Sequence, residues 1–321
     1  FNKKVSLSIN TGITTMESMF HDCVAFNNGA NVLSWTTSSA LSNVSHMFHG
    51  CVAFNKKVSL SINTGITTME SMFHGCVAFN NGSTSNNGSN SFIVTTSSAL
   101  SNVAYMFHGC IMFNQSFIFT VMTGVTTMQN MFYNCYKFNN GNTINNGTKP
   151  LNFNISSALL TVAHMFFGCS EFNQQFIANM SGVTTMESMF NGCSSFNNGN
   201  TSTLADKQLY LYLQNTSALT NLSYMFSGCI SLNQNVFTAD VTGVTTMESM
   251  FQGCVAFNNG STSNDGANPL EWETSSALVT VSYMFSNCTI FNQQVSFSDT
   301  TGITNNTGMF VGCSSFNNGI V

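Results

Sequence analysis

Short stretches of alternating apolar and polar residues recur along the chain. Residues 5–9 read Val-Ser-Leu-Ser-Ile, residues 58–62 repeat this pattern, and Phe117, Phe119 and Val121 continue it. A period of two is typical of a half-buried strand. Between these stretches, Leu-Ser-Trp at 33–35, Leu-Asn-Phe at 151–153 and Leu-Glu-Trp at 270–272 occupy corresponding places. We therefore predict one strand in every repeat unit, stacked on its equivalents into one parallel sheet.

Each predicted strand is followed by a turn and an apolar segment. Six units contain [Thr/Ser]-Gly-[Ile/Val]-Thr before the apolar segment, and their glycines predict a turn that uses positive φ, although other units have Ser-Ala-Leu there. The sequence Glu-Ser-Met-Phe-His-Gly-Cys then predicts one or two turns of α or 3-10 helix with Met, Phe and Cys pointing inward. The glycines are Gly12, Gly65, Gly124, Gly182, Gly243 and Gly302.

The cysteines define the repeat. All 11 lie in Met-Phe-x-x-Cys-x-x-[Phe/Leu]-Asn, and their spacings alternate between 24–25 and 34–36 residues after a first interval of 28. Residues 1–29 and 54–82 differ only by Asp22 in place of Gly75, as expected for a linear stack that accepts tandem duplication. We predict a single solenoid over residues 1–321, with about eleven alternating short and long coils and one strand and one short helical segment in each.

Three sets of residues are expected to stack from coil to coil. The buried cysteines are Cys23, Cys51, Cys76, Cys110, Cys135, Cys169, Cys193, Cys229, Cys254, Cys288 and Cys313. The core phenylalanines are Phe20, Phe48, Phe73, Phe107, Phe132, Phe166, Phe190, Phe226, Phe251, Phe285 and Phe310. The corner asparagines, expected to cap backbone groups or to form an amide ladder, are Asn27, Asn55, Asn80, Asn114, Asn139, Asn173, Asn197, Asn233, Asn258, Asn292 and Asn317.

The motif Val-Thr-Thr-Met-x-x-Met-Phe-x-x-Cys-x-x-Phe-Asn resembles the repeat of the BspA-like leucine-rich-repeat surface proteins, also called the bacterial surface 26-residue repeat family. The resemblance extends over essentially the whole chain. It implies an extended solenoid of leucine-rich-repeat type that is displayed on a surface and linked to adhesion. The chain departs from the more uniform repeat of that family by alternating two unit lengths and by inserting Asn-rich loops.

Charge is scarce, and this excludes several functions. Only 6% of the residues are charged, the net charge is −5, and all 7 basic residues are lysines. Such a chain cannot neutralise a run of phosphates, so we expect no nucleic-acid partner.

No apolar run approaches the roughly 20 residues of a membrane span. A targeting signal, if the protein has one, would lie outside this chain.

The cysteines allow two interpretations. Disulfides would leave at least one of the 11 thiols unpaired. We favour a column of free, buried thiols, because stacked strands lie about 4.8 Å apart and disulfide-bonded Cβ atoms only about 3.8 Å. No Cys-x-x-Cys pair of the kind that binds zinc is present.

Histidines and glutamates also fall into rows. His21, His49, His74 and His108 each follow Met-Phe, and such a row could bind metal or sense pH. We interpret it as an amphipathic surface row, since other residue types replace histidine in later coils, and we expect neither metal nor cofactor. A row of glutamates recurs only in alternate coils, which spaces out like charges and does not favour a catalytic pair. The glutamates are Glu17, Glu70, Glu187 and Glu248.

Four longer segments vary from unit to unit, at 83–91, 142–150, 200–208 and 261–269. Loops on a regular scaffold are where repeat proteins vary their contacts, although drift in polar loops would also explain the variation. The candidate contact residues are Asn86, Asn87, Asn145, Asn146, Asp206, Lys207, Asn264 and Asp265.

The sequence therefore predicts a non-enzymatic structural or adhesive rod at an extracellular, cell or virion surface. Its expected partners are a host or matrix protein or a glycan, contacted through the variable loops. Because the chain begins and ends inside the motif, we expect either a slice of a longer array or copies that stack end to end. The alternative function is thus an extracellular or virion filament assembled head to tail.

Overall fold

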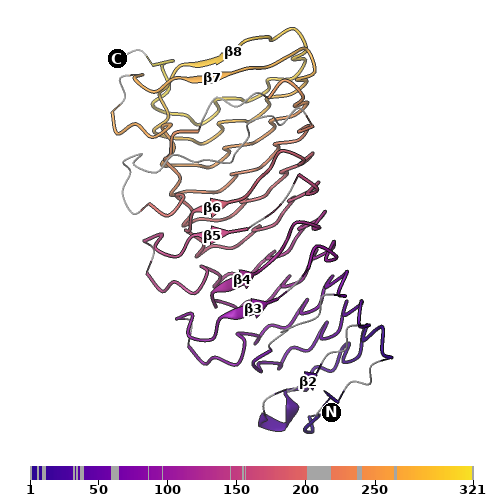
Figure 1. Ribbon diagram of the computed structural model, residues 1–321. Coiled ribbons are helices and arrows are strands. Elements are labelled where there is room, and N and C mark those ends of the chain that lie inside the picture. The colour runs from indigo at the N-terminus through magenta and orange to yellow at the C-terminus, as the bar shows by residue number, and fades with distance from the viewer. Residues whose placement is uncertain are drawn as a thin grey trace.

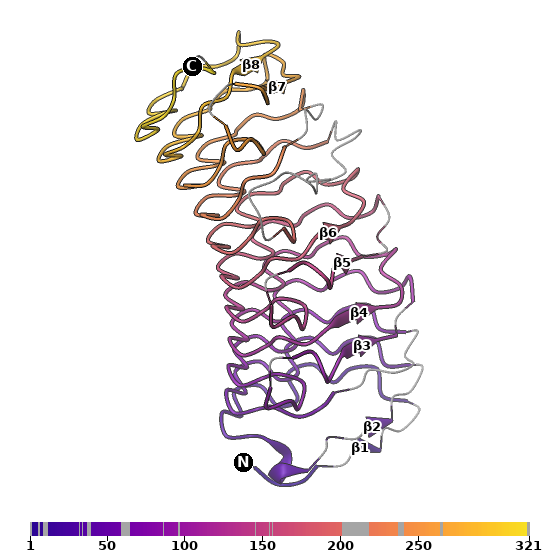
Figure 2. The same ribbon diagram turned by 90° about the vertical axis from the view of Figure 1, so that its left-hand side faces the viewer.

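The computed structural model describes residues 2–5, 7–8, 12–31, 33, 35–36, 40–58, 65–85, 87–95, 97–144, 146–153, 155, 157–200, 218–236, 241–263 and 266–319. The chain winds into an elongated stack of coils, and its N- and C-termini lie at opposite ends of the stack (Figure 1). The labelled strands follow one side of the stack, and a regular series of turns follows the other (Figure 2).

Short parallel strands recur in the coils, as the alternating pattern predicts. In β3 (Phe92–Val94) the side chains of Phe92 and Val94 are buried and that of Ile93 is exposed, and β4 and β7 show the same order. The parallel pairs are β1 (Leu7–Ser8) with β2 (Trp35–Thr36), β3 with β4 (Phe117–Phe119), β5 (Leu151–Asn152) with β6 (Phe176–Ile177), and β7 (Leu270–Trp272) with β8 (Val295–Phe297).

The prediction of one continuous sheet is wrong for the described residues, where the strands form four separate pairs. Between β4 and β5 the pairing is interrupted at the start of β4. The Phe92 N–H donates to the Ser116 carbonyl at 2.8 Å, which joins β3 to β4. The Phe117 N–H of β4 instead donates to Asn140 Oδ1 at 2.8 Å, so a side chain from the next coil replaces the strand partner.

A different line of backbone pairing runs through the whole stack. Ten isolated parallel bridges join one Thr or Asn of each coil to its equivalent in the next, directly before the apolar segment. The bridged residues are Thr15, Asn43, Thr68, Asn102, Thr127, Thr161, Thr185, Asn221, Thr246, Thr280 and Asn305. This ladder holds eleven coils in register.

The prediction of a helical segment in each coil is also wrong, because the described Met-Phe-x-x-Cys segments form consecutive turns. Alternate backbone N–H groups leave the coil: Phe132 donates to the Met165 carbonyl at 2.8 Å, whereas Cys135 donates to Phe132 within the coil at 3.0 Å. Asn130 and Asn134 have φ values of 55° and 56°, in the left-handed region that interrupts a right-handed helix. The one 3-10 helix among the described residues is η1 (Asn28–Ala30).

Gly124, one of the turn glycines, has a different role from the one predicted. Gly124 does not adopt positive φ. A Cβ at this position would overlap the Ser98 carbonyl oxygen of the preceding coil. Close approach of two backbones, which glycine alone permits without a clash, therefore accounts for Gly124.

The core consists of columns of stacked side chains. The phenylalanine of each Met-Phe pair stacks on its equivalent in the next coil, with ring centroids 5.3–5.7 Å apart from Phe20 to Phe310. In the central coils Met, Phe and Cys of the motif are fully buried. In the last coil Phe310 and Cys313 are half-buried, because no described coil covers them.

Candidate functional site

The eleven cysteines form a column beside the phenylalanines, and all are free thiols. Each of ten donates its S–H to the phenylalanine carbonyl of the preceding coil, as Cys135 does to Phe107 at 2.9 Å. Nine are buried, whereas Cys23 and Cys313 are half-buried. Burial raises the pKa of Cys51 to about 12, so this thiol stays protonated and can donate at neutral pH.

The corner asparagines connect every coil to the next. The Asn173 Oδ1 atom accepts the backbone N–H groups of Asn197 at 2.7 Å and Gly199 at 2.8 Å, while its Nδ2 donates to the Asn200 carbonyl at 3.0 Å. The same bond from side-chain oxygen to backbone N–H is made at eleven successive steps from Asn2 to Asn317. The corner asparagines were predicted either to cap backbone groups or to form an amide ladder, and the hydrogen bonds described here cap backbone groups.

Sequence reasoning missed a second polar column beside the corner asparagines. Its members are the residues after them, and they alternate between Asn and Gln in most coils. Gln115 is fully buried, donates to Asn80 Oδ1 at 2.9 Å and accepts the Asn90 N–H at 2.9 Å. Asn140 holds the start of β4, as described above. The signal was the alternation of Phe-Asn-Asn-Gly with Phe-Asn-Gln along the sequence.

These asparagines also tie the base of each described long loop to the scaffold. The Nδ2 groups of Asn81, Asn140 and Asn259 donate to carbonyls nine residues further along, each at 3.0 Å. The loops contact the corner of the following long coil: a Cβ on Gly88 would lie 2.8 Å from the Gly141 carbonyl oxygen. Lys149 Nζ donates to the Asn87 carbonyl at 3.4 Å, which links loop 83–91 to loop 142–150.

Two of the eight predicted contact residues can be placed. Asn87 is exposed, and its Oδ1 accepts the Ser85 hydroxyl at 3.0 Å. Asn146 is half-buried and bonds Asn142 Nδ2 at 2.7 Å, so its side chain organises the loop. The others lie outside the described residues: Asn86, Asn145, Asp206, Lys207, Asn264 and Asp265.

The glutamates of the short coils receive hydrogen bonds from an adjacent coil. Asn43, Asn102 and Asn221 donate their amides to Glu17, Glu70 and Glu187 at 3.0–3.2 Å, and the Tyr224 hydroxyl donates to Glu248 at 2.9 Å. The glutamate row therefore links coils through neutral partners.

The histidine row is a stack of rings that continues into other aromatic residues. The centroids of His21 and His49 lie 4.5 Å apart, those of His74 and His108 lie 4.3 Å apart, and His108 stacks on Tyr133 at 4.5 Å. Burial, followed by the nearby imidazoles of His108, His49 and His46, lowers the pKa of His74 to about 4. Burial also lowers the pKa values of His49 and His108.

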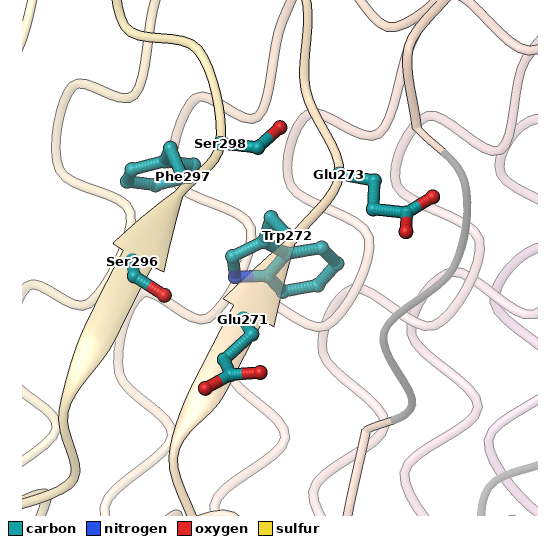
Figure 3. A pocket seen from close by; sticks show the side chains of 6 residues that line it. All are labelled: Glu271, Trp272, Glu273, Ser296, Phe297 and Ser298. Carbon is teal, nitrogen blue, oxygen red and sulfur yellow. The ribbon is translucent and has the colours of Figure 1, made fainter.

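A shallow pocket lies beside β7 and β8 (Figure 3). Glu271 and Glu273 are exposed on either side of Trp272. The pocket is also lined by Ser296 and Phe297 of β8 and by Ser298, which follows them. Trp272 is 2% exposed, and its indole N–H has no hydrogen-bond partner among the described residues. The pocket thus combines carboxylate acceptors with hydroxyl groups.

Within the described part of the chain, no helix has the length and apolar character needed to cross a membrane.

The repeated short parallel strands and the Asn and Gln columns define a leucine-rich-repeat-like solenoid. The family model for "Mycoplasma protein of unknown function, DUF285" matches residues 1–87, 90–158, 145–264 and 202–321. Because these matches include nearly the whole chain, the protein belongs to that family. No curated protein matches this chain.

Solved structures that are similar to the chain include two bacterial proteins. A leucine-rich repeat protein from Bacteroides ovatus is 13% identical, with 92% of this chain and 84% of that chain covered and a TM-score of 0.31. One from Eubacterium ventriosum is 16% identical, with 96% and 82% covered and a TM-score of 0.37. The finer assignment to the BspA-like surface proteins stays a prediction.

We predict that Asn173→Ala lowers the free energy of unfolding by at least about 3 kcal/mol, because it leaves two buried N–H groups and one carbonyl without their partner at roughly 1–3 kcal/mol each. Chemical denaturation followed by circular dichroism measures this loss. The matched control is Asn179→Ala, since Asn179 is exposed and, within the described part of the chain, accepts a local bond from the Ser181 N–H. Equal, small effects of the two substitutions would contradict the capping role.

We predict that stability falls between pH 6.5 and pH 4 partly because of His74. The unfolded chain binds a proton near pH 6.5, whereas His74 in the fold resists protonation down to about pH 4, so the free energy of unfolding decreases as the pH falls. The rings that face His74 are those of His49, His108 and Tyr105. His74→Tyr keeps a ring in the column, as Tyr133 does, and should lose less stability than the wild type.

The measurement is the denaturation midpoint at several pH values in metal-free buffer. Identical pH profiles for the wild type and His74→Tyr would show that His74 does not carry this dependence.

Proposed function

We propose that the protein is a non-enzymatic, surface-exposed repeat rod that presents variable polar loops to a protein or glycan partner. The observation that carries the proposal is the anchoring of the described long loops. Asn81, Asn140 and Asn259 are buried and hold both the corner and the far end of their loops. A rigid base with exposed, differing tips is the arrangement that binding scaffolds use.

The loop tips offer suitable chemistry. Thr84 and Asn87 are exposed in loop 83–91, and Thr143 and Ile144 are exposed in loop 142–150, where the Ile144 side chain is 64% exposed. Hydroxyl and amide groups can hydrogen-bond the hydroxyls of a glycan or the backbone of a protein, and an exposed aliphatic side chain adds apolar contact.

The roles of the short-coil glutamates support a function without catalysis. General acid–base chemistry on a glycan needs two carboxylates that flank the scissile bond. Glu17, Glu70 and Glu187 instead accept amide hydrogen bonds from the adjacent coil. These hydrogen bonds link adjacent coils of the stack.

We predict that Thr84→Ala combined with Ile144→Ser weakens binding at least tenfold, because both side chains project from the anchored loops. The probe is an array of glycans together with purified extracellular-matrix proteins, and the readout is the dissociation constant for whichever ligand binds the wild type. The control is Val52→Ser with Val255→Ser, which changes exposed residues that follow the motif cysteines. Unchanged binding by the loop variant, or the absence of any ligand, would overturn the proposal.

Head-to-tail assembly is the alternative. Its support is the polarity of the stack, since a coil uses different residues toward its two neighbours. The Phe132 N–H donates to Met165 of the following coil, whereas the Thr126 N–H donates to Ser101 of the preceding coil. The two faces of a coil therefore differ and complement each other, which allows a heterologous contact that propagates. Filaments of the purified chain in electron micrographs, without any partner, would favour this function over the first.

A further inference from the structure

Three metal-ligating side chains meet near one end of the histidine row. His21, Asp22 and His49 each offer one donor atom, and these atoms lie within 4.8 Å of one another. His21 Nδ1 is 3.3 Å from one carboxylate oxygen of Asp22, and His49 Nδ1 is 4.0 Å from the other. The two imidazole rings are stacked with an interplanar angle of 2°, and the Nδ1 atoms of both lie near the Asp22 carboxylate.

Asp22 is exceptional within the repeat. The equivalent position is Gly or Asn in every other coil, and the duplicated unit 54–82 has Gly75 there. Asp22 adopts φ 56°, in the same left-handed region as the equivalent residues of the other coils. The next coil leaves room for the carboxylate, because a Cβ on Gly50 would overlap Asp22 Oδ1.

His49 contributes a donor atom that the fold leaves unused. Its Nδ1 is buried, and among the described residues it has no hydrogen-bond partner. A buried polar atom without a partner costs stability. The lone pair of this nitrogen could coordinate a metal ion.

We propose that His21, Asp22 and His49 bind a divalent first-row transition-metal ion such as Zn²⁺, with water completing the coordination. Two imidazole nitrogens and one carboxylate oxygen form a three-residue ligand set typical of zinc sites that keep an open position. Parallel stacked rings share no in-plane point, so one ring must turn as the ion binds. The side chain of His21 is 39% exposed and that of His49 27%, so the ring of His21 is the one with more room to turn.

The repeat supplies a matched comparison within the same chain. His74 and His108 stack as His21 and His49 do, but Gly75 stands where the carboxylate would be. A Cβ on Gly75 meets only ordinary contacts with Gly50, at 3.8 Å. The substitution Gly75→Asp therefore makes residues 54–82 identical to residues 1–29 and should build a second site between His74 and His108.

The test is isothermal titration of the full chain, without a polyhistidine tag, with ZnCl₂. The wild type should bind one equivalent, and Asp22→Gly, which restores the residue of the natural duplicate, should weaken binding at least tenfold. His164→Tyr serves as a control that changes a histidine outside the cluster and should bind as the wild type does. Gly75→Asp should bind two equivalents.

Three results would overturn the proposal: no zinc binding by the wild type, equal affinity of Asp22→Gly and the wild type, or a single equivalent in a folded Gly75→Asp chain. Circular dichroism of each variant establishes that it is folded. Asp22→Gly keeps all four histidines of the row, so its titration separates the proposed site from binding to the histidines alone.

Discussion

Every coil is held in register with the next by hydrogen bonds from a corner asparagine to the backbone. In this position an amide side chain does what a strand partner does in a sheet, because its oxygen accepts one or two N–H groups that would otherwise be buried without a partner. The bond recurs at each step from Asn2 to Asn317. Once this register is set, like residues must stack on like residues along the whole chain.

That constraint explains the unusual composition. Identical side chains in adjacent coils lie about 5 Å apart, so a column of like charges would repel itself. Columns of Phe, Cys, Asn and Thr carry no charge and tolerate this spacing. The glutamates are separated by intervening coils, and the neutral amides of Asn43, Asn102 and Asn221 meet three of them. A low charged fraction is therefore a consequence of in-register stacking.

The sequence predicts the parts of the fold that depend on periodicity. The alternation at 117–119 indicates a strand, and the spacing of Met, Phe and Cys indicates a repeated inward face. The two left-handed positions of each turn segment differ in how well the sequence shows them. One is filled by residues such as Ser18, His46 and Tyr105, which give no sign of that conformation, whereas the other is glycine in most coils, a signal that the prediction of a helix did not use. The continuous bridge ladder was missed for a similar reason, since Thr15 and Asn43 belong to different local sequences.

The cluster at Asp22 was missed because its chemistry exists only across coils. His21 and Asp22 are adjacent in the sequence, but His49 reaches them from the following coil. The histidines recur from coil to coil and so form a row, whereas the informative residue is Asp22, whose carboxylate is present in only one coil. In a repeat protein, a single departure from the repeat can therefore indicate a site.

The most direct test of the stacked core is the reactivity of the eleven cysteines toward iodoacetamide under native conditions, read residue by residue by mass spectrometry. The structure predicts that Cys23 and Cys313 react first, because they are half-buried, and that the nine buried thiols stay unmodified until the chain is unfolded. Comparable rates at Cys135 or Cys169 and at the two end cysteines would contradict the account.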